Sequence, residues 1–329
     1  MVEAKIRPFD DLIAAYQEYS ARYDFIKDPV HLYEPMGYIM KQGGKKIRPL
    51  ALLMVQNTFN GNIDSGFPVA LALEMFHNFT LMHDDIMDNA ETRRGQPTVF
   101  HKYGINAAIL SGDVMLVEAT QLINLCSREN QSEQILELFL QTAKEVCEGQ
   151  RFDMDFEQRE TVSLSEYLEM IRLKTSVLLA TSLKMGALLS KCNATLCETL
   201  YELGINLGLG FQIHDDWLDF YGDSKQTGKK IGGDILQGKK SILILTALQD
   251  LDPVNQHKLL NDYKLKLNDE DKLAKIGQWF EQLDIKNKVS KRYLSYQEKC
   301  EAIIQQMECE SWQKNKLREF VTLILDRKY

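Results

Sequence analysis

The stretch Ser165–Ser190 reads SEYLEMIRLKTSVLLATSLKMGALLS, and it decides the fold class. Its apolar residues recur at helical spacing over a broad face, which predicts a long helix that is mostly buried. Ser163 or Ser165 could cap the start of this helix, and Glu166 and Glu169 follow in its early turns. The sequence therefore predicts at least one helix that packs inside a helical protein.

Proline placement extends this prediction to the whole chain. Seven prolines are present, and only Pro253 lies in the last 232 residues. Because a proline costs a helix interior about 3 kcal/mol, its absence favours long helices, and Ser132–Cys147 again shows helical spacing. Breaks are expected at Asn60–Gly66, Gly95–Pro97, Arg159–Ser163 and Tyr221–Gly233. Without a Pro/Ser-rich linker, we expect one all-α domain over residues 1–329, with ten or more helices and a more polar part after Asp252.

Composition excludes several classes of protein. A chain of 329 residues that is 44% hydrophobic can bury a large core, which excludes a disordered chain. Its net charge of −8 argues against nucleic acid as the main partner. The longest run without Asp, Glu, Lys or Arg is Pro49–Ile63, too short for a transmembrane segment of about 20 residues. Six cysteines without a CxxC pair, and an N-terminus without the apolar core of a signal peptide, favour free thiols in the cytoplasm.

One acidic motif occurs twice. TLMHDDIMDN (Thr80–Asn89) and FQIHDDWLDF (Phe211–Phe220) both contain HDDxxD. The aspartates of the two motifs are Asp84, Asp85 and Asp88, and Asp215, Asp216 and Asp219. Asp84 and Asp88 lie one helical turn apart, so their like charges repel and favour a bound cation. Solvated acidic faces are the alternative, but two copies in apolar surroundings and oxygen-only ligands point to Mg²⁺.

Basic residues gather in three glycine-containing segments of this acidic chain. They are GGKKIR (Gly43–Arg48), RRG (Arg93–Gly95) and GKKIGGDILQGKK (Gly228–Lys240). Glycine allows the backbone to approach a ligand closely, and Lys and Arg bind phosphate. Any one of these segments alone would be ordinary surface. Together with two candidate metal motifs they indicate a diphosphate substrate.

In this order the motifs resemble those of the trans-isoprenyl diphosphate synthases, the polyprenyl synthetase family, from about Tyr33 to Leu245. The matching segments are GGKKIRP (Gly43–Pro49), His77, HDDIMDNAETRRGQPT (His83–Thr98), LSGD (Leu110–Asp113), EGQRFDM (Glu148–Met154), Lys174–Thr175, GFQIHDDWLD (Gly210–Asp219) and Gly228–Lys240. The chain departs from the family where Lys230 replaces a usual proline and where Ser241-Ile242-Leu243 replaces Thr-Leu-Pro. Both departures retain Lys229, Asp234 and Lys239, so we expect activity to be kept.

The resemblance implies an all-helical isoprenoid synthase fold, a helical bundle around a deep central active-site cavity, usually as a homodimer. Its substrates would be isopentenyl diphosphate and an allylic diphosphate (dimethylallyl, geranyl or farnesyl). Three Mg²⁺ would bridge the aspartates and the allylic diphosphate, with Asp84, Asp88 and Asp215 as direct ligands. Asp85, Asp216 and Asp219 would bind directly or through water.

The resemblance also implies how the two diphosphates are bound. The residues implied to contact the allylic diphosphate are Arg93, Lys174, Gln212, Lys229 and Lys239. Those implied to hold isopentenyl diphosphate are Lys45, Arg48, His77 and Arg94. Lys174 and Lys229 would join the aspartates in catalysis by stabilising the departing diphosphate. Thr175 either contacts phosphate or packs, and we interpret His83 and His214 as structural.

Product length is expected to depend on the helix that carries Asp84. Phe79 lies five residues before Asp84, about 7–8 Å along a helix, and Phe76 lies one turn further. In related synthases bulky residues here form the tunnel floor, and a single aromatic followed by the small Thr80 resembles geranylgeranyl (C20) synthases. Farnesyl diphosphate (C15) is the second choice. The alternative is that Phe79 faces a neighbouring helix and another residue forms the floor.

Two other functions remain to be weighed. A class I terpene cyclase would carry a second metal motif with Asn, Ser/Thr and Glu, and would lack GGKxxR. A non-catalytic helical subunit is expected to lose aspartates, whereas this chain has all six. Both observations favour a magnesium-dependent prenyltransferase.

Overall fold

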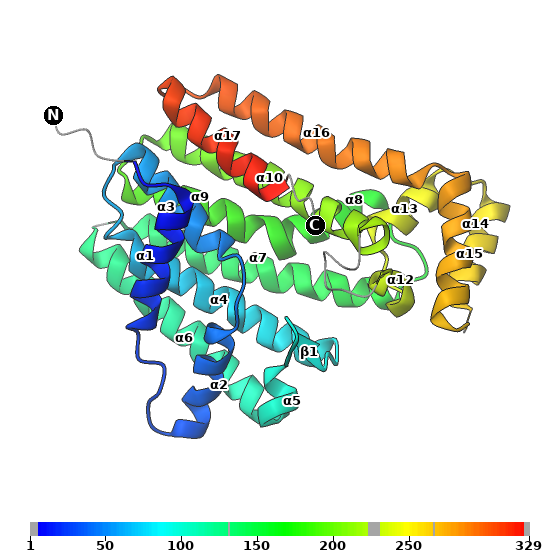
Figure 1. Cartoon of the computed structure of the whole chain (residues 1–329), viewed down its shortest axis with the longest axis horizontal. Helices are drawn as coiled ribbons and strands as arrows, with labels where there is room; N and C mark the ends of the chain where they lie inside the picture. The colour runs from blue at the N-terminus through cyan, green and yellow to red at the C-terminus, as the bar shows by residue number, and fades with distance from the viewer. Residues whose placement is uncertain (1–5, 131, 223–230, 266, 326–329) are drawn as a thin grey trace. The chain divides into compact units, whose positions relative to one another are not determined.

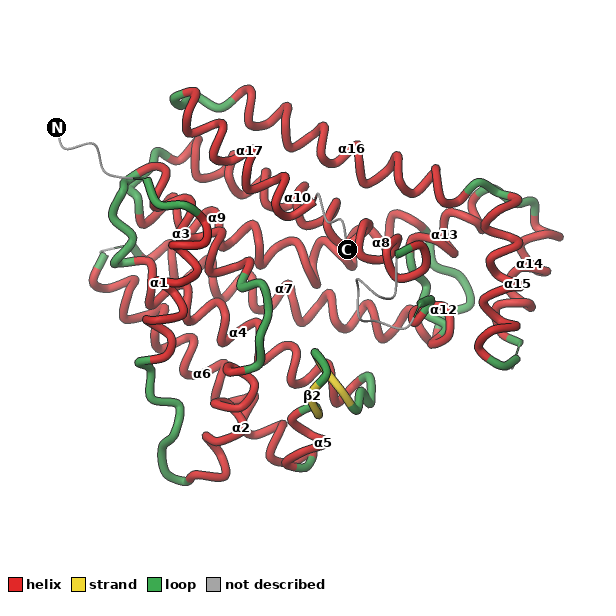
Figure 2. Tube along the Cα trace, in the orientation of Figure 1, coloured by secondary structure: helices red, strands yellow, loops and turns green. Residues whose placement is uncertain are grey.

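A computed structural model describes residues 6–130, 132–222, 231–265 and 267–325. Helices make up most of the described chain, and its strands are confined to one hairpin of two short strands (Figure 2). The all-α prediction is therefore confirmed. The chain divides into two compact units, residues 1–142 with 181–200, and residues 143–180 with 201–329. Each unit is described by itself below, and the single domain stays a prediction.

In the first unit, a buried central helix positions the first aspartate motif. The helices that lie wholly in this unit are α1 (Phe9–Ala21), α2 (Val30–Lys41), α3 (Ile47–Phe59), α4 (Gly66–Met87), α5 (Val99–Tyr103) and α6 (Ile105–Glu129) (Figure 1). Helix α4 packs against α3 and α6. A Cβ on Gly112 of α6 would lie 2.3 Å from Nε2 of His83, so glycine is what lets α6 approach α4 this closely. Asp84 and Asp85 thus lie near the end of a helix that is held on two sides.

A short hairpin follows α4. Strands β1 (Thr92–Arg93) and β2 (Gln96–Pro97) pair antiparallel, at the break predicted near Gly95–Pro97. Arg94 and Gly95 between them both have positive φ, 53° and 73°, as a tight two-residue hairpin turn requires. The turn places Arg93 and Arg94 beside the end of α4.

The second unit carries the second motif and the more polar C-terminal helices. The helices that lie wholly in it are α8 (Leu164–Ile171), the π-helix η1 (Arg172–Ser176), α12 (Gly233–Gln237), α13 (Ile242–Gln249), α14 (Pro253–Lys264), α15 (Asp269–Gln282), α16 (Ile285–Gln306) and α17 (Ser311–Leu325). Three further helices run through both units: α7 (Glu133–Gln158), α9 (Val177–Leu189) and α10 (Ala194–Tyr221). In this unit α13 packs against α8 and α16, and α15 packs against α12, α14 and α16.

The predicted helix over 165–190 is present, with one local change. Ser163 caps it, because its hydroxyl accepts from the Glu166 N–H while the Glu166 carboxylate accepts from the Ser163 N–H. Between α8 and α9 the chain forms the π-turn η1, which contains Lys174 and Thr175. A Cβ on Gly149 of α7 would lie 2.3 Å from the Lys174 nitrogen, so the α7 backbone lies directly against this turn. Single π-turns occur often at functional sites.

Helix α6 is, by length and composition alone, apolar enough to cross a membrane. One such helix is weak evidence, because the helices of soluble proteins pass the same test. The predicted absence of a transmembrane segment stays a prediction. Several of the exposed apolar side chains of the chain lie on this helix, and they are considered under the proposed function.

Candidate active site

The first aspartate motif lies at the C-terminal end of α4. Asp85 is only 2% exposed, and Nε and Nη2 of Arg93 donate to its Oδ1 over 2.8 and 2.7 Å. Burial raises the pKa of Asp85, and the Arg93 guanidinium opposes that rise. Asp84 Oδ2 lies 3.7 Å from Arg93 Nη2, while Asp88 is the exposed C-cap residue. One arginine from the hairpin thus organises two of the three aspartates.

Basic residues gather around His77 on the same helix. Burial lowers the pKa of His77 well below its usual value, and the positive charges of Arg48, Arg94, Arg93 and Lys46 lower it further. The imidazole is therefore neutral at pH 7. Burial also lowers the pKa of Arg48 to about 10, which leaves this guanidinium charged. Three of the four residues predicted to hold isopentenyl diphosphate, Arg48, His77 and Arg94, are thus electrostatic neighbours, and the fourth, Lys45, is exposed.

A buried ion pair lies next to this basic group. Lys46 Nζ lies 2.9 Å from Oε1 of Glu74, and both side chains are almost fully buried. The charge of Glu74 raises the pKa values of Arg48 and Arg94 against the effect of burial. Arg94 also donates to the carbonyl oxygens of Gly43 and Gln42, which ties the RRG turn to the GGKKIR segment. Glu74 therefore compensates a cluster of cations that would otherwise repel one another.

The second motif lies near the C-terminal end of α10, in the second unit. Asp216 is 6% exposed and accepts three hydrogen bonds from uncharged donors. They come from Tyr167 Oη at 2.6 Å, Gln212 Nε2 at 3.0 Å and the Ile242 N–H at 3.2 Å. Burial, with the nearby charge of Asp234, raises the pKa of Asp216 to about 7, although these donors act in the opposite direction.

Asp219 connects the same helix to the third basic segment. Its Oδ2 accepts from the Asp234 N–H over 3.1 Å, and its carbonyl oxygen accepts from the Gly232 N–H over 2.7 Å. Asp215 is half-buried on α10. Lys239 follows α12, and its carbonyl oxygen accepts a 2.5 Å hydrogen bond from Tyr263 Oη. Lys229 lies outside the described residues.

Two residues predicted to contact the allylic diphosphate, Lys174 and Gln212, lie on η1 and α10, and Thr175 follows Lys174 on η1. Lys174 Nζ donates to Asp153 Oδ2 over 2.6 Å, and Thr175 Oγ1 donates to Gln212 Oε1 over 3.1 Å. Because Gln212 also donates to Asp216, a chain of hydrogen bonds connects Thr175 to the second motif. These contacts link the π-turn to the aspartates within one unit.

The chemistry of the motifs fits Mg²⁺. Their ligand atoms are all carboxylate oxygens, and both motifs lie at the C-terminal ends of helices, where the helix dipole favours cations. Among the described residues no three His, Cys, Asp or Glu side chains gather closely enough to hold a metal by themselves. Mg²⁺ keeps several waters and takes phosphate oxygens, so it needs few protein ligands in one place. The carboxylates present therefore suit magnesium held together with a diphosphate.

Aromatic residues surround the positions expected to set product length. Phe76 and Phe79 are buried with their ring centroids 5.6 Å apart, and Phe76 also packs edge-on against Phe139 of α7, at 5.5 Å. Thr80 donates its hydroxyl hydrogen bond to the His77 carbonyl. His83 packs against Phe79, and its Nε2 lies 3.2 Å from the Ile109 carbonyl oxygen. His214 stacks on Tyr293 at 4.3 Å, so both histidines have packing contacts.

Sequence reasoning missed three residues that organise these groups. Glu74, Asp153 and Tyr167 contact predicted site residues, but none was selected. A usable signal for Glu74 was present, because it is a single acid within a long apolar stretch. Asp153 lies within the matching segment EGQRFDM. Nothing local marks Tyr167, because its partner Asp216 is 49 residues away.

The chain is similar to known proteins in both sequence and structure. Residues 29–280 match the family described as polyprenyl synthetase. A short chain isoprenyl diphosphate synthase of Methanocaldococcus jannaschii is 41% identical over 229 residues, which is 70% of each chain. A geranylgeranyl diphosphate synthase of Methanosarcina mazei is 41% identical over 224 residues, 67% of this chain and 68% of the other. A crystal structure of a geranylgeranyl pyrophosphate synthase superimposes with a TM-score of 0.92 at 37% identity, covering 98% of this chain and 100% of the other.

Proposed function

Since the chain belongs to the polyprenyl synthetase family and is a prenyltransferase of the isoprenoid synthase fold, we propose that its product is all-trans geranylgeranyl diphosphate. It would form this C20 product by head-to-tail (1′-4) condensation of isopentenyl diphosphate with allylic diphosphates. The similarity to synthases that bear the geranylgeranyl name supports this length, as does Phe79 upstream of the first motif. The observation that carries the proposal is the pair of aspartate motifs, each with its middle aspartate buried and held by protein donors and its other aspartates more exposed.

In the first unit, the basic group around His77 would bind the diphosphate of isopentenyl diphosphate. Arg48 remains charged, and the neutral His77 can donate or accept a hydrogen bond without adding repulsion. Glu74 holds Lys46 and lowers the cost of gathering these cations before the substrate arrives. Arg93, which pairs with Asp85, would contact the allylic diphosphate. The carbon chain would extend toward the aromatic residues Phe76 and Phe79.

In the second unit, Lys174 and Lys239 would stabilise the departing diphosphate. The C1–O bond of the allylic substrate breaks with both electrons going to the diphosphate oxygen. The double bond of isopentenyl diphosphate then attacks C1 through its C4, and the released diphosphate takes the proton from C2 of the same unit as the new double bond forms. Mg²⁺, held by Asp84, Asp88, Asp215 and Asp219, would supply positive charge to the diphosphate oxygens. Preorganised cations at the leaving group lower the barrier because they are already in place when the charge develops.

Mass spectrometry of the dephosphorylated products tests this proposal. Purified enzyme with Mg²⁺, isopentenyl diphosphate and dimethylallyl diphosphate should give geranylgeraniol as the main alcohol. Farnesol as the main product would instead assign a farnesyl diphosphate synthase. Diphosphate release without chain extension would indicate a terpene cyclase, and no turnover with any allylic primer would indicate a non-catalytic subunit.

We also propose that the chain forms a homodimer through α6. Five large apolar residues on this helix are 40–58% exposed: Ile105, Ile109, Leu110, Val117 and Leu125. Leu140 on the neighbouring α7 is exposed as well. An apolar face this broad is unfavourable in water, and a second copy of the same face would cover it. Light scattering should give twice the chain mass for wild type and for Gln121→Glu, and the monomer mass for Val117→Glu. A wild-type monomer would refute the dimer.

The cytoplasm is the proposed compartment. All six cysteines are free thiols in the structure, as expected in a reducing environment. Fractionation of cells that express the full chain should recover it with the soluble proteins, and recovery in the membrane fraction would contradict this proposal.

A further inference from the structure

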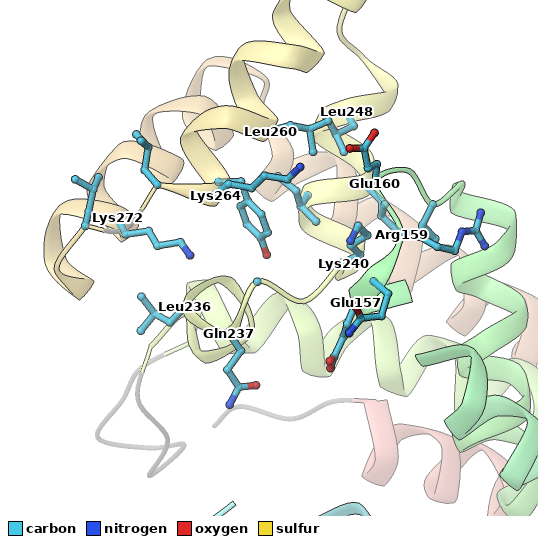
Figure 3. Close-up of a pocket in the computed structure, with 18 of the residues that line it drawn as sticks. Glu157, Arg159, Glu160, Leu236, Gln237, Lys240, Leu248, Leu260, Lys264 and Lys272 are labelled. Carbon is cyan, nitrogen blue, oxygen red and sulfur yellow. The ribbon is translucent and has the colours of Figure 1, made fainter. Parts of the chain in front are cut away.

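A cavity of about 640 Å³ lies in the second unit, and no residue assigned to the proposed reaction lines it, although Lys239 is adjacent in sequence to two lining residues. The end of α7, the α12–α13 connection, α14 and α15 line it (Figure 3). Three lysines from three of these segments, Lys240, Lys264 and Lys272, contribute to its lining. We call them the lysine group.

Among the described residues, the lysine group forms no ion pair with a carboxylate, although Glu157, Glu160 and Asp269 also line the cavity. Lys240 Nζ donates to the Phe156 carbonyl over 2.8 Å. Burial lowers the pKa of Lys240, the charges of Lys264 and Arg159 lower it further, and the charge of Glu157 acts in the opposite direction. Lys240 and Lys264 therefore repel each other, and Glu157 offsets only part of the effect. An anion between them would relieve this repulsion.

The remaining walls of the cavity are largely apolar and fixed. Leu236, Ile244, Leu248 and Leu260 line it together with Tyr263. The Tyr263 ring is held from both ends: its hydroxyl donates to the Lys239 carbonyl, and Lys272 Nζ lies 5.4 Å from the ring centroid. A ring fixed in this way gives the cavity a formed wall before any ligand enters. Hydrocarbon is the chemistry that such walls accept.

We propose that this cavity is a third anion site, beyond the two proposed substrate diphosphate sites, and that it takes a phosphate-bearing ligand with an apolar tail. The ammonium groups of the lysine group bind the phosphate, and the leucine and isoleucine side chains cover the tail. The phosphate chemistry has two possible sources, free inorganic diphosphate and a prenyl diphosphate. The choice of a prenyl diphosphate as the ligand rests on the proposed function. The existence of the anion site does not.

Isothermal titration calorimetry in EDTA tests the site. Without Mg²⁺ the metal-dependent binding expected of the aspartate motifs is absent, so the heat reports binding to cationic side chains. Binding to the basic group around His77 contributes equally in all the proteins compared, so the difference between variants reports the cavity. Geranyl diphosphate and inorganic diphosphate are titrated into wild type, Lys264→Ala/Lys272→Ala and the charge-matched control Lys258→Ala/Lys291→Ala. Lys258 and Lys291 are exposed on α14 and α16 and do not line the cavity. Thermal melts check that all three proteins fold. If the double variant Lys264→Ala/Lys272→Ala does not fold, the single variants Lys264→Gln and Lys272→Gln take its place.

We expect at least a tenfold rise in Kd for the cavity variant and none for the control. Tighter binding of geranyl diphosphate than of inorganic diphosphate would assign the prenyl ligand, and equal binding would assign the free anion. If wild type binds neither probe, or if all three proteins bind equally well, the site does not exist. Condensation with Mg²⁺ is measured on the same proteins and should be unchanged. Its failure in wild type would refute the proposed function and leave the binding result standing.

Discussion

The two HDDxxD motifs have the same spacing, but their middle aspartates are held in different ways. Asp85 pairs with a charged guanidinium from the adjacent hairpin, whereas Asp216 accepts three hydrogen bonds from uncharged donors. The donors to Asp216 come from α8, α10 and the start of α13, so it connects three segments. The same local pattern therefore has a different structural setting in each unit.

The comparison also separates the aspartates by role. In each motif the middle carboxylate is buried and occupied by protein donors, which leaves fewer lone pairs for a metal. The aspartates before and after it in each motif, Asp84, Asp88, Asp215 and Asp219, are all more exposed. We infer that the middle aspartates mainly fix each helix end, and that the flanking ones meet the metal.

Removing a flanking aspartate should have the largest effect and should be equally severe in both motifs. Asp84→Ala and Asp215→Ala are each expected to lower turnover by about a thousandfold or more, because charge stabilisation at the leaving group is lost. Steady-state rates with Mg²⁺ measure this, with thermal melts to confirm folding and the exposed Asp10→Ala as control. Turnover like that of wild type in either folded variant would count decisively against the site.

Stability should distinguish the middle aspartates. Arg93→Ala leaves the buried Asp85 without its ion-pair partner and should cost about 2–3 kcal/mol of unfolding free energy. Tyr167→Phe removes one of three donors to Asp216 and should cost about 1 kcal/mol. Urea unfolding measures both free-energy losses, and replacement of the exposed Arg128 on α6 by Ala is the control. Arg93→Ala/Asp85→Asn should regain much of the loss, because it removes the uncompensated charge. Equal losses in the two single variants would refute the contrast.

Substrate affinity should divide between the units. Arg48→Ala and Lys45→Ala in the first unit should raise KM for isopentenyl diphosphate about tenfold, the loss of one charged contact, with less effect on the allylic substrate. Lys239→Ala in the second unit should do the reverse, and Lys258→Ala should change neither. Initial rates with each substrate varied in turn give the KM for each substrate in every variant. If all three variants change both KM values alike, the assignment of two pockets is wrong.

The residues upstream of the motifs differ as well, with the smallest expected effect on rate. Five residues before Asp84 stands Phe79, whereas five residues before Asp215 stands Gly210. Only the first helix can therefore form an aromatic floor at this position. Phe79→Ala, or Phe76→Ala one turn further, should lengthen the product by one or more isoprene units in the mass spectrum. Unchanged products from both variants and from the double variant would place the floor elsewhere.

The sequence predicted the helices well because helical spacing is local. The cap at Ser163, the breaks at Arg159–Ser163 and Gly95–Pro97, and the helical setting of both motifs all depend on residues within a few positions. The π-turn at Arg172–Ser176 was not predicted, because it depends on the close approach of Gly149 from another helix. The sequence predicted a break in the helices at Gly95–Pro97, but not the hairpin turn that forms there.

The contacts between site residues were not predicted from the sequence. Arg93 was assigned to the allylic diphosphate through the family resemblance, and its pairing with Asp85, eight residues away, comes from the structure alone. Tyr167 lies 49 residues from Asp216, and Lys46 lies 28 from Glu74, so those pairs depend on tertiary packing. The cavity lined by the lysine group combines residues from α7, α12, α13, α14 and α15 and their connections, and no motif marks it.

The most direct test of the account is the number of divalent ions bound in the presence of a diphosphate. Electron paramagnetic resonance of Mn²⁺, which takes the same oxygen ligands as Mg²⁺, counts these ions with a non-reactive allylic thiolodiphosphate bound. The account predicts three ions per chain in wild type, and fewer in both Asp84→Ala and Asp215→Ala. Tyr167→Phe should keep all three, since Asp216 is assigned a structural role. A full set of three ions in either aspartate variant would contradict the claim that both motifs hold the metals.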